Sequence, residues 1–146
     1  LASVTRAVMI AIISIITFML IIEIQITNYL ALIAFTFLSS FILGNVGIIA
    51  GLWSEKFDNM ATVTNFVIIP LSFLSGTFYS IERLPGLLKT ISEFNPFFYM
   101  IDGFRYSFIG QADGSITVGL VYLTILSVVS WFITYLLYKN GYKIKS

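Results

Sequence analysis

Long apolar runs separated by short polar breaks constrain this chain more than any other feature. Four such runs cover roughly residues 7–22, 30–53, 61–79 and 116–138. A helix needs about 20 mostly apolar residues to cross the roughly 30 Å hydrocarbon core of a bilayer. Because lipid cannot satisfy backbone polar groups, such runs are expected to be helical. The sequence therefore predicts an all-α integral membrane protein with four transmembrane helices, in which residues 1–146 form a single transmembrane domain.

Composition supports a membrane location and excludes several classes of site. Hydrophobic residues make up 58% of the chain and charged residues 10%, whereas a soluble domain carries about 25% charged residues. The net charge of +1 gives no excess of positive charge that would indicate binding to nucleic acid. Cysteine and histidine are both absent, which removes thiol chemistry, zinc sites built on these ligands and histidine-based triads. We therefore expect no catalytic residue, no metal site and no cofactor in this chain.

The distribution of basic residues predicts the orientation in the membrane. Four spans place both ends of the chain on one side, and cytoplasmic loops carry an excess of Lys and Arg. The side of the termini carries Arg6, Lys56, Lys139, Lys143 and Lys145, and the other side carries Arg83, Lys89 and Arg105. Both ends are therefore expected in the cytoplasm. Because the chain starts at Leu1 and not at Met, we read it as the C-terminal part of a longer protein.

Small residues occupy one face of the second apolar run. They are spaced four, three and four residues apart, which places them on a single helical stripe. Small residues let helix backbones approach closely in membranes, so the stripe predicts helix packing or a dimer interface, with a substrate path as the alternative. Asn45, beside the stripe, is expected to bond to a neighbouring helix. The stripe consists of Ser40, Gly44, Gly47 and Gly51.

The third run contains two residues that interrupt an otherwise apolar helix, Asn65 and Pro70. Proline removes one intrahelical hydrogen bond, so the helix is expected to kink or loosen at that point. Asn65 and Pro70 are therefore candidates for a substrate path or gate, and ordinary helix packing is the alternative reading of both.

The segment 81–110 is too polar to span the membrane and too apolar for an ordinary loop in water. Near Pro85–Phe94, apolar residues recur at helical spacing with polar residues between them, which predicts a short amphipathic helix at the outer membrane surface. Pro96 ends this helix. A second helix, roughly 97–109, is about 20 Å long and too short to cross the core. We therefore predict an external re-entrant helix pair between the third and fourth spans.

Two opposite charges lie three residues apart on the second helix of this pair. Asp102 and Arg105 can pair there, which lowers the cost of charge near lipid. A structural role is expected for the pair, with a catalytic role as the alternative. Gly103 allows a neighbouring element to approach closely, and Gly110 is well placed to cap the helix end.

Short motifs then point to a family. They are Gly51-Leu52-Trp53-Ser54, Ser75-Gly76-Thr77-Phe78-Tyr79, Leu84-Pro85 and Asn95-Pro96-Phe97-Phe98-Tyr99-Met100-Ile101-Asp102-Gly103-Phe104-Arg105. With them, the chain resembles the C-terminal half of a permease (transmembrane) subunit of the type-2 ABC exporters, which include bacterial drug, lipid and polysaccharide exporters. The last motif is the most specific, and its residues Asn95, Pro96, Tyr99, Asp102, Gly103 and Arg105 would belong to the external re-entrant helices.

The resemblance implies partners and a mechanism. It implies a permease homodimer in the bacterial cytoplasmic membrane and an ABC ATPase subunit that binds ATP and magnesium. The four spans would correspond to the last four of six, and the main coupling helix would precede Leu1. A secondary contact with the ATPase would then fall on Glu55, Lys56 and Asp58, with a solvated turn as the alternative.

Other classes of function stay open at this point. A gradient-driven transporter or channel subunit is the main rival, although such proteins ordinarily carry ionisable groups inside their spans. A membrane-embedded enzyme would depend on carboxylates alone, and a purely structural membrane subunit fits every span. This chain has no G-x-x-x-x-G-K-S/T phosphate-binding loop, so any ATP hydrolysis is expected on a partner.

Overall fold

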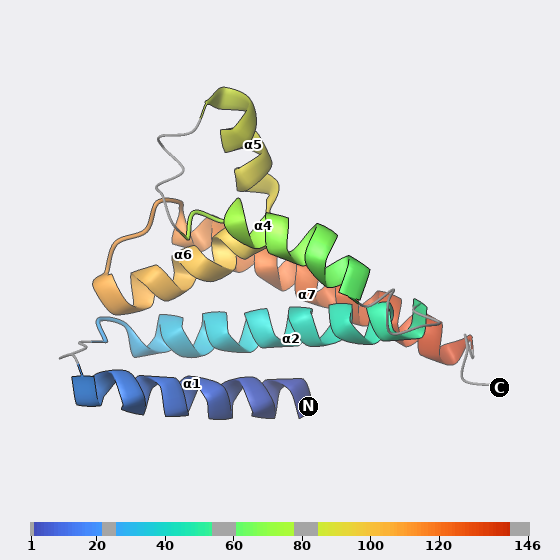
Figure 1. The fold of residues 1–146 in the computed structure, drawn as a ribbon, viewed down its shortest axis with the longest axis horizontal. Helices are drawn as coiled ribbons and strands as arrows, with labels where there is room; N and C mark the ends of the chain where they lie inside the picture. Colours follow the sequence, from blue (N-terminus) through green and yellow to red (C-terminus); the bar gives the residue numbers. More distant parts are fainter. Residues whose placement is uncertain (1, 22–25, 54–60, 78–84, 141–146) are drawn as a thin grey trace.

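The computed structural model describes residues 2–21, 26–53, 61–77 and 85–140 as a set of helices (Figure 1). In these ranges no residue is in a strand, which agrees with the predicted all-α class. The helices are α1 (Ala2–Ile21), α2 (Tyr29–Trp53), η1 (Thr64–Ile68), α4 (Ile69–Phe73), α5 (Gly86–Phe94), α6 (Pro96–Ile109) and α7 (Ile116–Lys139).

Helix α2 lies at the centre of the arrangement. It contacts α1 on one side and both α6 and α7 on the other, and α6 also contacts α7. Figure 1 shows α1 running beside α2 along the long axis, while α5 stands away from the other helices. In this view α1 begins near the middle of the molecule and runs to the left, whereas α7 runs to the right and ends there.

Among the described residues, two helices are long and apolar enough to cross a membrane. They are Tyr29–Leu52, with a mean hydropathy of 2.1, and Ile116–Lys139, with a mean hydropathy of 2.2. Only 28% and 22% of their most apolar windows are buried within the chain, so most of their apolar surface faces outward. Shorter apolar helices cover Val4–Thr17 and Ala61–Phe73. The total of four spans stays a prediction.

The helix of the third apolar run loosens just before Pro70. Residues Thr64–Ile68 form a π-helical turn, in which the Ile69 N–H bonds to the carbonyl of Thr64 instead of that of Asn65. Proline has no N–H and its ring crowds the carbonyl of the preceding turn. A wider turn next to the proline is one way to relieve that crowding. The loosening expected from the sequence is therefore present, and it takes the form of a π turn.

The buried core forms where α2, α6 and α7 meet. Its buried members are Ala31, Phe35, Ile42, Met100 and Leu123. Phe35 is fully buried, and its ring lies directly over Gly103 of α6. A Cβ atom at Gly103 would stand 2.2–2.4 Å from three carbons of the Phe35 ring. The close approach predicted at Gly103 is thus confirmed, and α6 can lie this near to α2 only because residue 103 has no side chain.

Candidate functional site

Asn95 joins the start of α6 to the end of α4. Its side-chain oxygen accepts a hydrogen bond from the Phe97 N–H at 3.0 Å, which caps the N-terminus of α6. Its side-chain nitrogen donates to the Leu71 carbonyl at 2.6 Å. Carbonyls in the last turn of a helix lack intrahelical donors, so one buried amide serves both helix ends. Asn95 is only 2% exposed.

Asp102 holds the turn that leads into α7. Its two carboxylate oxygens accept hydrogen bonds from the backbone N–H groups of Asp113, at 2.8 Å, and Gly114, at 2.9 Å. The residue is 3% exposed. A Cβ atom at Gly114 would lie 3.0 Å from the Phe98 ring, so the turn packs tightly against α6. A buried carboxylate on α6 therefore sets where α7 begins.

Arg105 links the same turn to the chain that follows α4. Its guanidinium lies 2.8 Å from an Asp113 carboxylate oxygen and 3.4 Å from Asp102, and it donates to the Gly76 carbonyl at 2.6 Å. Gly76 has a φ of 76°, a left-handed conformation that favours glycine. The predicted pairing of Asp102 with Arg105 is thus present, but it is the longest contact in a wider network.

The polar network, defined as Asn95, Asp102, Arg105 and Asp113, ties α4, α6 and the start of α7 together. Its carboxylates are occupied by backbone donors and by the guanidinium, which favours the structural reading over the catalytic one. The described residues contain no group of three or more acidic, His or Cys side chains placed to hold a metal. Tyr106, one turn from Asp102, packs against the hydrophobic core.

A pair of tyrosines connects α5 and α6 to α7. The Tyr122 hydroxyl donates to the Phe94 carbonyl at the end of α5, at 2.7 Å. The Tyr99 and Tyr122 rings lie 4.9 Å apart between centroids, and Gly119 makes room for the Tyr99 ring. Burial raises the pKa of the Tyr99 phenol, and the negative charge of Glu93 raises it further. Tyr99 belongs to the motif recognised in the sequence, whereas no sequence pattern marks Tyr122.

Replacing Tyr122 with phenylalanine removes this hydrogen bond and keeps the ring contact. We expect a loss of about 0.5–1.5 kcal/mol in the free energy of unfolding, the usual net value of one hydrogen bond. Amide hydrogen exchange in α5 should become faster than in the wild type. Tyr135→Phe is the control, since the Tyr135 ring stacks on Trp131 and its hydroxyl has no hydrogen bond within the described residues. Equal exchange in both variants would show that Tyr122 does not hold α5.

The C-terminus of α6 is capped by the segment that precedes α2. The Ser107 carbonyl accepts hydrogen bonds from the N–H groups of Thr27, at 2.9 Å, and Asn28, at 3.0 Å. The Thr27 hydroxyl donates to the Phe108 carbonyl at 2.8 Å. Gly110 takes the left-handed cap conformation with a φ of 75°, as predicted. The contact with Thr27 had no sequence signal, because the two segments lie about 80 residues apart.

The small-residue stripe of α2 is only partly packed within the chain. Ser40 is buried and bonds to its own helix at the Thr36 carbonyl, 2.6 Å away, and Gly44 is half-buried. Gly47 and Gly51 are exposed, and a Cβ atom at either would meet no other atom within 4 Å. No described helix of this chain therefore packs against this end of the stripe.

Three further sequence predictions have different outcomes. Asn45 is buried, and its side chain donates to the Phe41 carbonyl of its own helix at 2.9 Å. Among the described residues the amide therefore bonds one turn back and not, as had been expected, to a neighbouring helix. Asn65 and Pro70 are exposed on their helix, and their role in a path or gate stays a prediction. The candidate ATPase contacts Glu55, Lys56 and Asp58 lie outside the described residues.

Comparison with known proteins places the chain in a family. Residues 1–109 match the ABC-2 type transporter family. The inner membrane transport permease YadH of Escherichia coli K12 is 33% identical over 109 residues, which are 75% of this chain and 43% of the relative. Nodulation protein J of Rhizobium leguminosarum bv. viciae is 26% identical over 90 residues, or 62% of this chain and 35% of that protein. No solved structure matches the chain significantly.

The chain spans less than half the length of these curated relatives. The matched residues include α1, α2, α5 and α6, and they end where α6 ends. They therefore contain Asn95, Asp102 and Arg105 of the polar network, while Asp113 and α7 lie beyond the match. Since the family match covers most of the chain and the described helices are apolar, this protein belongs to the ABC-2 type transporter family of membrane proteins.

Proposed function

We propose that this chain is part of the permease subunit of an ATP-driven exporter, which moves a drug, lipid or polysaccharide-type substrate out across the bacterial cytoplasmic membrane. The observation that carries the proposal is the family match over residues 1–109. The Escherichia coli relative is named an inner membrane transport permease. ATP and magnesium bind a separate ATPase subunit, and this chain supplies spans that the ATPase moves.

In the proposed orientation, both ends of the chain face the cytoplasm. Helix α1 runs from right to left in Figure 1 and α7 runs from left to right, ending at Lys139; these opposite directions support placing both ends on one side of the membrane. The turn between α6 and α7 then faces outside. With 14 residues, α6 is about 21 Å long, short of the roughly 30 Å core. It enters the membrane from outside and returns.

The polar network gives this proposal a mechanical basis. Asn95 and Arg105 hold the last carbonyls of the third apolar segment, at Leu71 and Gly76, and Asp102 holds the turn into α7. A movement of the third apolar segment or of α7 therefore moves α5 and α6 together. ATP shifts the transporter between states only as far as it binds one state more tightly. The network converts that shift into movement of an outer gate formed by α5 and α6.

The exposed end of the stripe, Gly47 and Gly51, is the proposed contact with a second permease copy. Gly47→Cys and Gly51→Cys should each form a disulfide-linked dimer on mild oxidation in membranes, because a disulfide requires Cα atoms within about 7 Å. This chain has no cysteine of its own. Ala31→Cys is the matched control, since Ala31 is buried in the core of one copy and should not cross-link. Monomers only from both stripe variants would contradict this interface.

Purification of the full-length gene product from its native host tests the function. In a mild detergent, we expect an ABC ATPase subunit to copurify in equal stoichiometry and to hydrolyse ATP. The region of Glu55, Lys56 and Asp58 is the proposed secondary contact, so charge reversal at Lys56 should weaken copurification. A homo-oligomer without an ATPase and without ATP hydrolysis would contradict the proposal and favour a gradient-driven transporter or channel subunit.

A further inference from the structure

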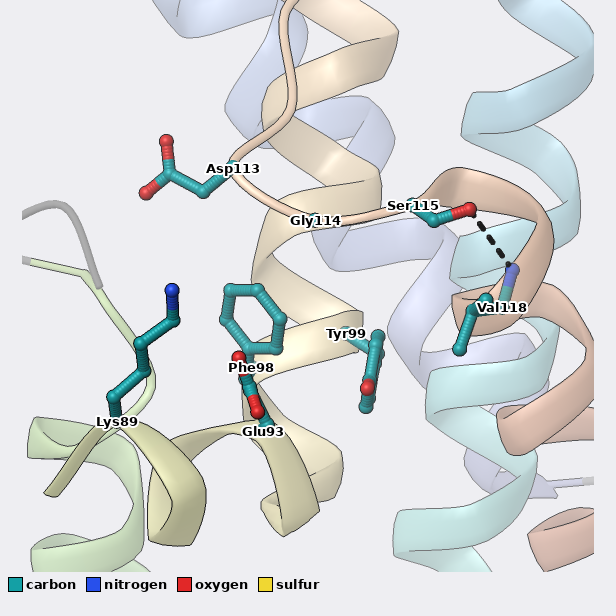
Figure 2. Close-up of a pocket in the computed structure, with 8 residues that line it drawn as sticks. All are labelled: Lys89, Glu93, Phe98, Tyr99, Asp113, Gly114, Ser115 and Val118. Atoms are coloured by element: carbon teal, nitrogen blue, oxygen red, sulfur yellow. Dashed lines mark hydrogen bonds between the residues drawn. The ribbon is translucent and has the colours of Figure 1, made fainter. Parts of the chain in front are cut away.

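A cavity lies where α5, α6 and the turn before α7 meet (Figure 2). Its volume is about 200 Å³. The parts of its lining that matter here are Lys89 and Glu93 from α5, Phe98 and Tyr99 from α6, and Asp113 from the turn. The proposed transport path on α2 and the third apolar run includes none of these five residues.

The cavity carries both signs of charge, and two of its charges are unused. Lys89 and Glu93 are exposed and stand one turn apart on α5, yet neither forms an ion pair with another described residue. In Figure 2 both side chains extend from α5 beside the Phe98 ring. The Asp113 carboxylate is already paired with Arg105 at 2.8 Å. Within the part of the chain that the structure describes, one ammonium group and one carboxylate therefore have no ion-pair partner and can contact a ligand.

An apolar groove continues from this cavity along α7. It has a volume of about 350 Å³ and is lined by Thr117, Val118, Val121, Tyr122 and Ile125. Val118 lines both the cavity and the groove, so the two adjoin at this residue. The side chains of Val118, Val121 and Ile125 are 53%, 55% and 59% exposed. From 118 to 125 the groove follows α7 for about 10 Å.

The order of these features matches one kind of molecule. Helix α7 is a candidate membrane span that begins at Ile116, so the charged cavity lies at the level of the lipid headgroups and the groove leads into the hydrocarbon. The ligand needs a cationic and an anionic group at one end and an aliphatic chain at the other. A purely anionic headgroup would face Glu93 and Asp113 with Lys89 as its only cation in the cavity.

We propose that α5, α6 and α7 bind a phospholipid of the surrounding bilayer whose headgroup carries both an ammonium and a phosphate. Lys89 contacts the phosphate, and Glu93 contacts the ammonium against the aromatic faces of Phe98 and Tyr99. One acyl chain lies in the groove between Val118 and Ile125. Because a ligand stabilises the state that binds it, the lipid holds α5 against α7. This inference requires α7 to span the membrane and is otherwise independent of the cargo and of ATP hydrolysis.

Photolabelling of the full-length protein in vesicles tests the proposal. Two probes are compared, each a phospholipid with a diazirine in its acyl chain, one with an ethanolamine headgroup and one with a glycerol headgroup. Mass spectrometry should locate ethanolamine-probe adducts in residues 117–125, several-fold more abundant than glycerol-probe adducts. Equal labelling by both probes, or no adduct in this segment, would overturn the proposal. This comparison uses the wild type and so does not depend on the folding of a variant.

Charge variants identify the residues that select the headgroup. Lys89→Glu and Glu93→Lys should each lower labelling by the ethanolamine probe about fivefold, the effect of losing one exposed charge contact. Lys139→Glu, at the far end of α7, is the matched control and should label like the wild type. Labelling should also persist during ATP turnover. Labelling that disappears on addition of ATP would show that the lipid is cargo and would overturn the assignment to a bilayer lipid.

Discussion

Replacing Gly103 with alanine is expected to lower the free energy of unfolding by about 1–3 kcal/mol, the usual cost of overpacking a core. The new methyl group would lie 2.2–2.4 Å from carbons of the Phe35 ring. Phe35 is fully buried, so its ring has no free space to enter, and α2 and α6 must move apart. The gain in helix propensity from glycine to alanine, at most about 1 kcal/mol, opposes this cost.

The measurement is unfolding of the purified full-length protein in mixed micelles with increasing denaturing detergent. Gly86→Ala is the matched control, because a Cβ atom at Gly86 meets no other atom within 4 Å. We expect that variant to be as stable as the wild type or slightly more stable. Adding Phe35→Leu to Gly103→Ala should recover part of the loss, since contacting residues are coupled. If both glycine variants unfold alike, α6 does not depend on its contact with Phe35.

Replacing Asp102 with alanine is expected to lower the free energy of unfolding by about 3–5 kcal/mol, because it removes a buried carboxylate that accepts two backbone hydrogen bonds. The substitution leaves the N–H groups of Asp113 and Gly114 without their acceptors. Hydrogen bonds to charged groups contribute about 1.5–3 kcal/mol each. Arg105 keeps its contacts with Asp113 and the Gly76 carbonyl, so its charge stays paired. The main effect should therefore be on the turn between α6 and α7.

The stability of Asp102→Ala is compared with that of Asp113→Ala. The comparison distinguishes the contribution of the buried carboxylate, Asp102, from that of the more exposed one, Asp113. The Asp113 side chain is 21% exposed against 4% for Asp102, and its loss removes one partly exposed ion pair. We expect a cost of about 1 kcal/mol for Asp113→Ala. Hydrogen exchange should be faster at residues 113–118 in Asp102→Ala than in Asp113→Ala. The reverse order would contradict the role assigned to Asp102.

Helix boundaries between residues 85 and 110 could be predicted from the sequence, since they depend on local backbone chemistry. Pro85 precedes the first residue of α5, Pro96 opens α6 and Gly110 caps it, each within a residue or so of the prediction. The pairing of Asp102 with Arg105 was likewise local, because residues three apart share a helix face. From the sequence, the helix was expected to kink or loosen at Pro70. The sequence does not indicate that the helix adjusts to the missing N–H donor by forming a π turn.

The sequence by itself determined the membrane class, the family, the apolar segments and the local punctuation by proline and glycine. The class, the apolar segments and the helix boundaries follow from the length of apolar runs and from the allowed backbone angles of single residues. The family follows from the short motifs that the chain shares with its members. Only the tertiary structure decided that Asn95 bonds to Leu71, that Arg105 bonds to Gly76 and that Phe35 rests on Gly103. In each of these contacts, a side chain meets part of the chain that is distant in sequence: a backbone carbonyl for Asn95 and Arg105, and a glycine for Phe35. Such partners are set by how the helices pack. A buried polar side chain forms a hydrogen bond with whichever complementary group the packing brings within reach, and the Phe35 ring contacts Gly103 because α2 packs against α6.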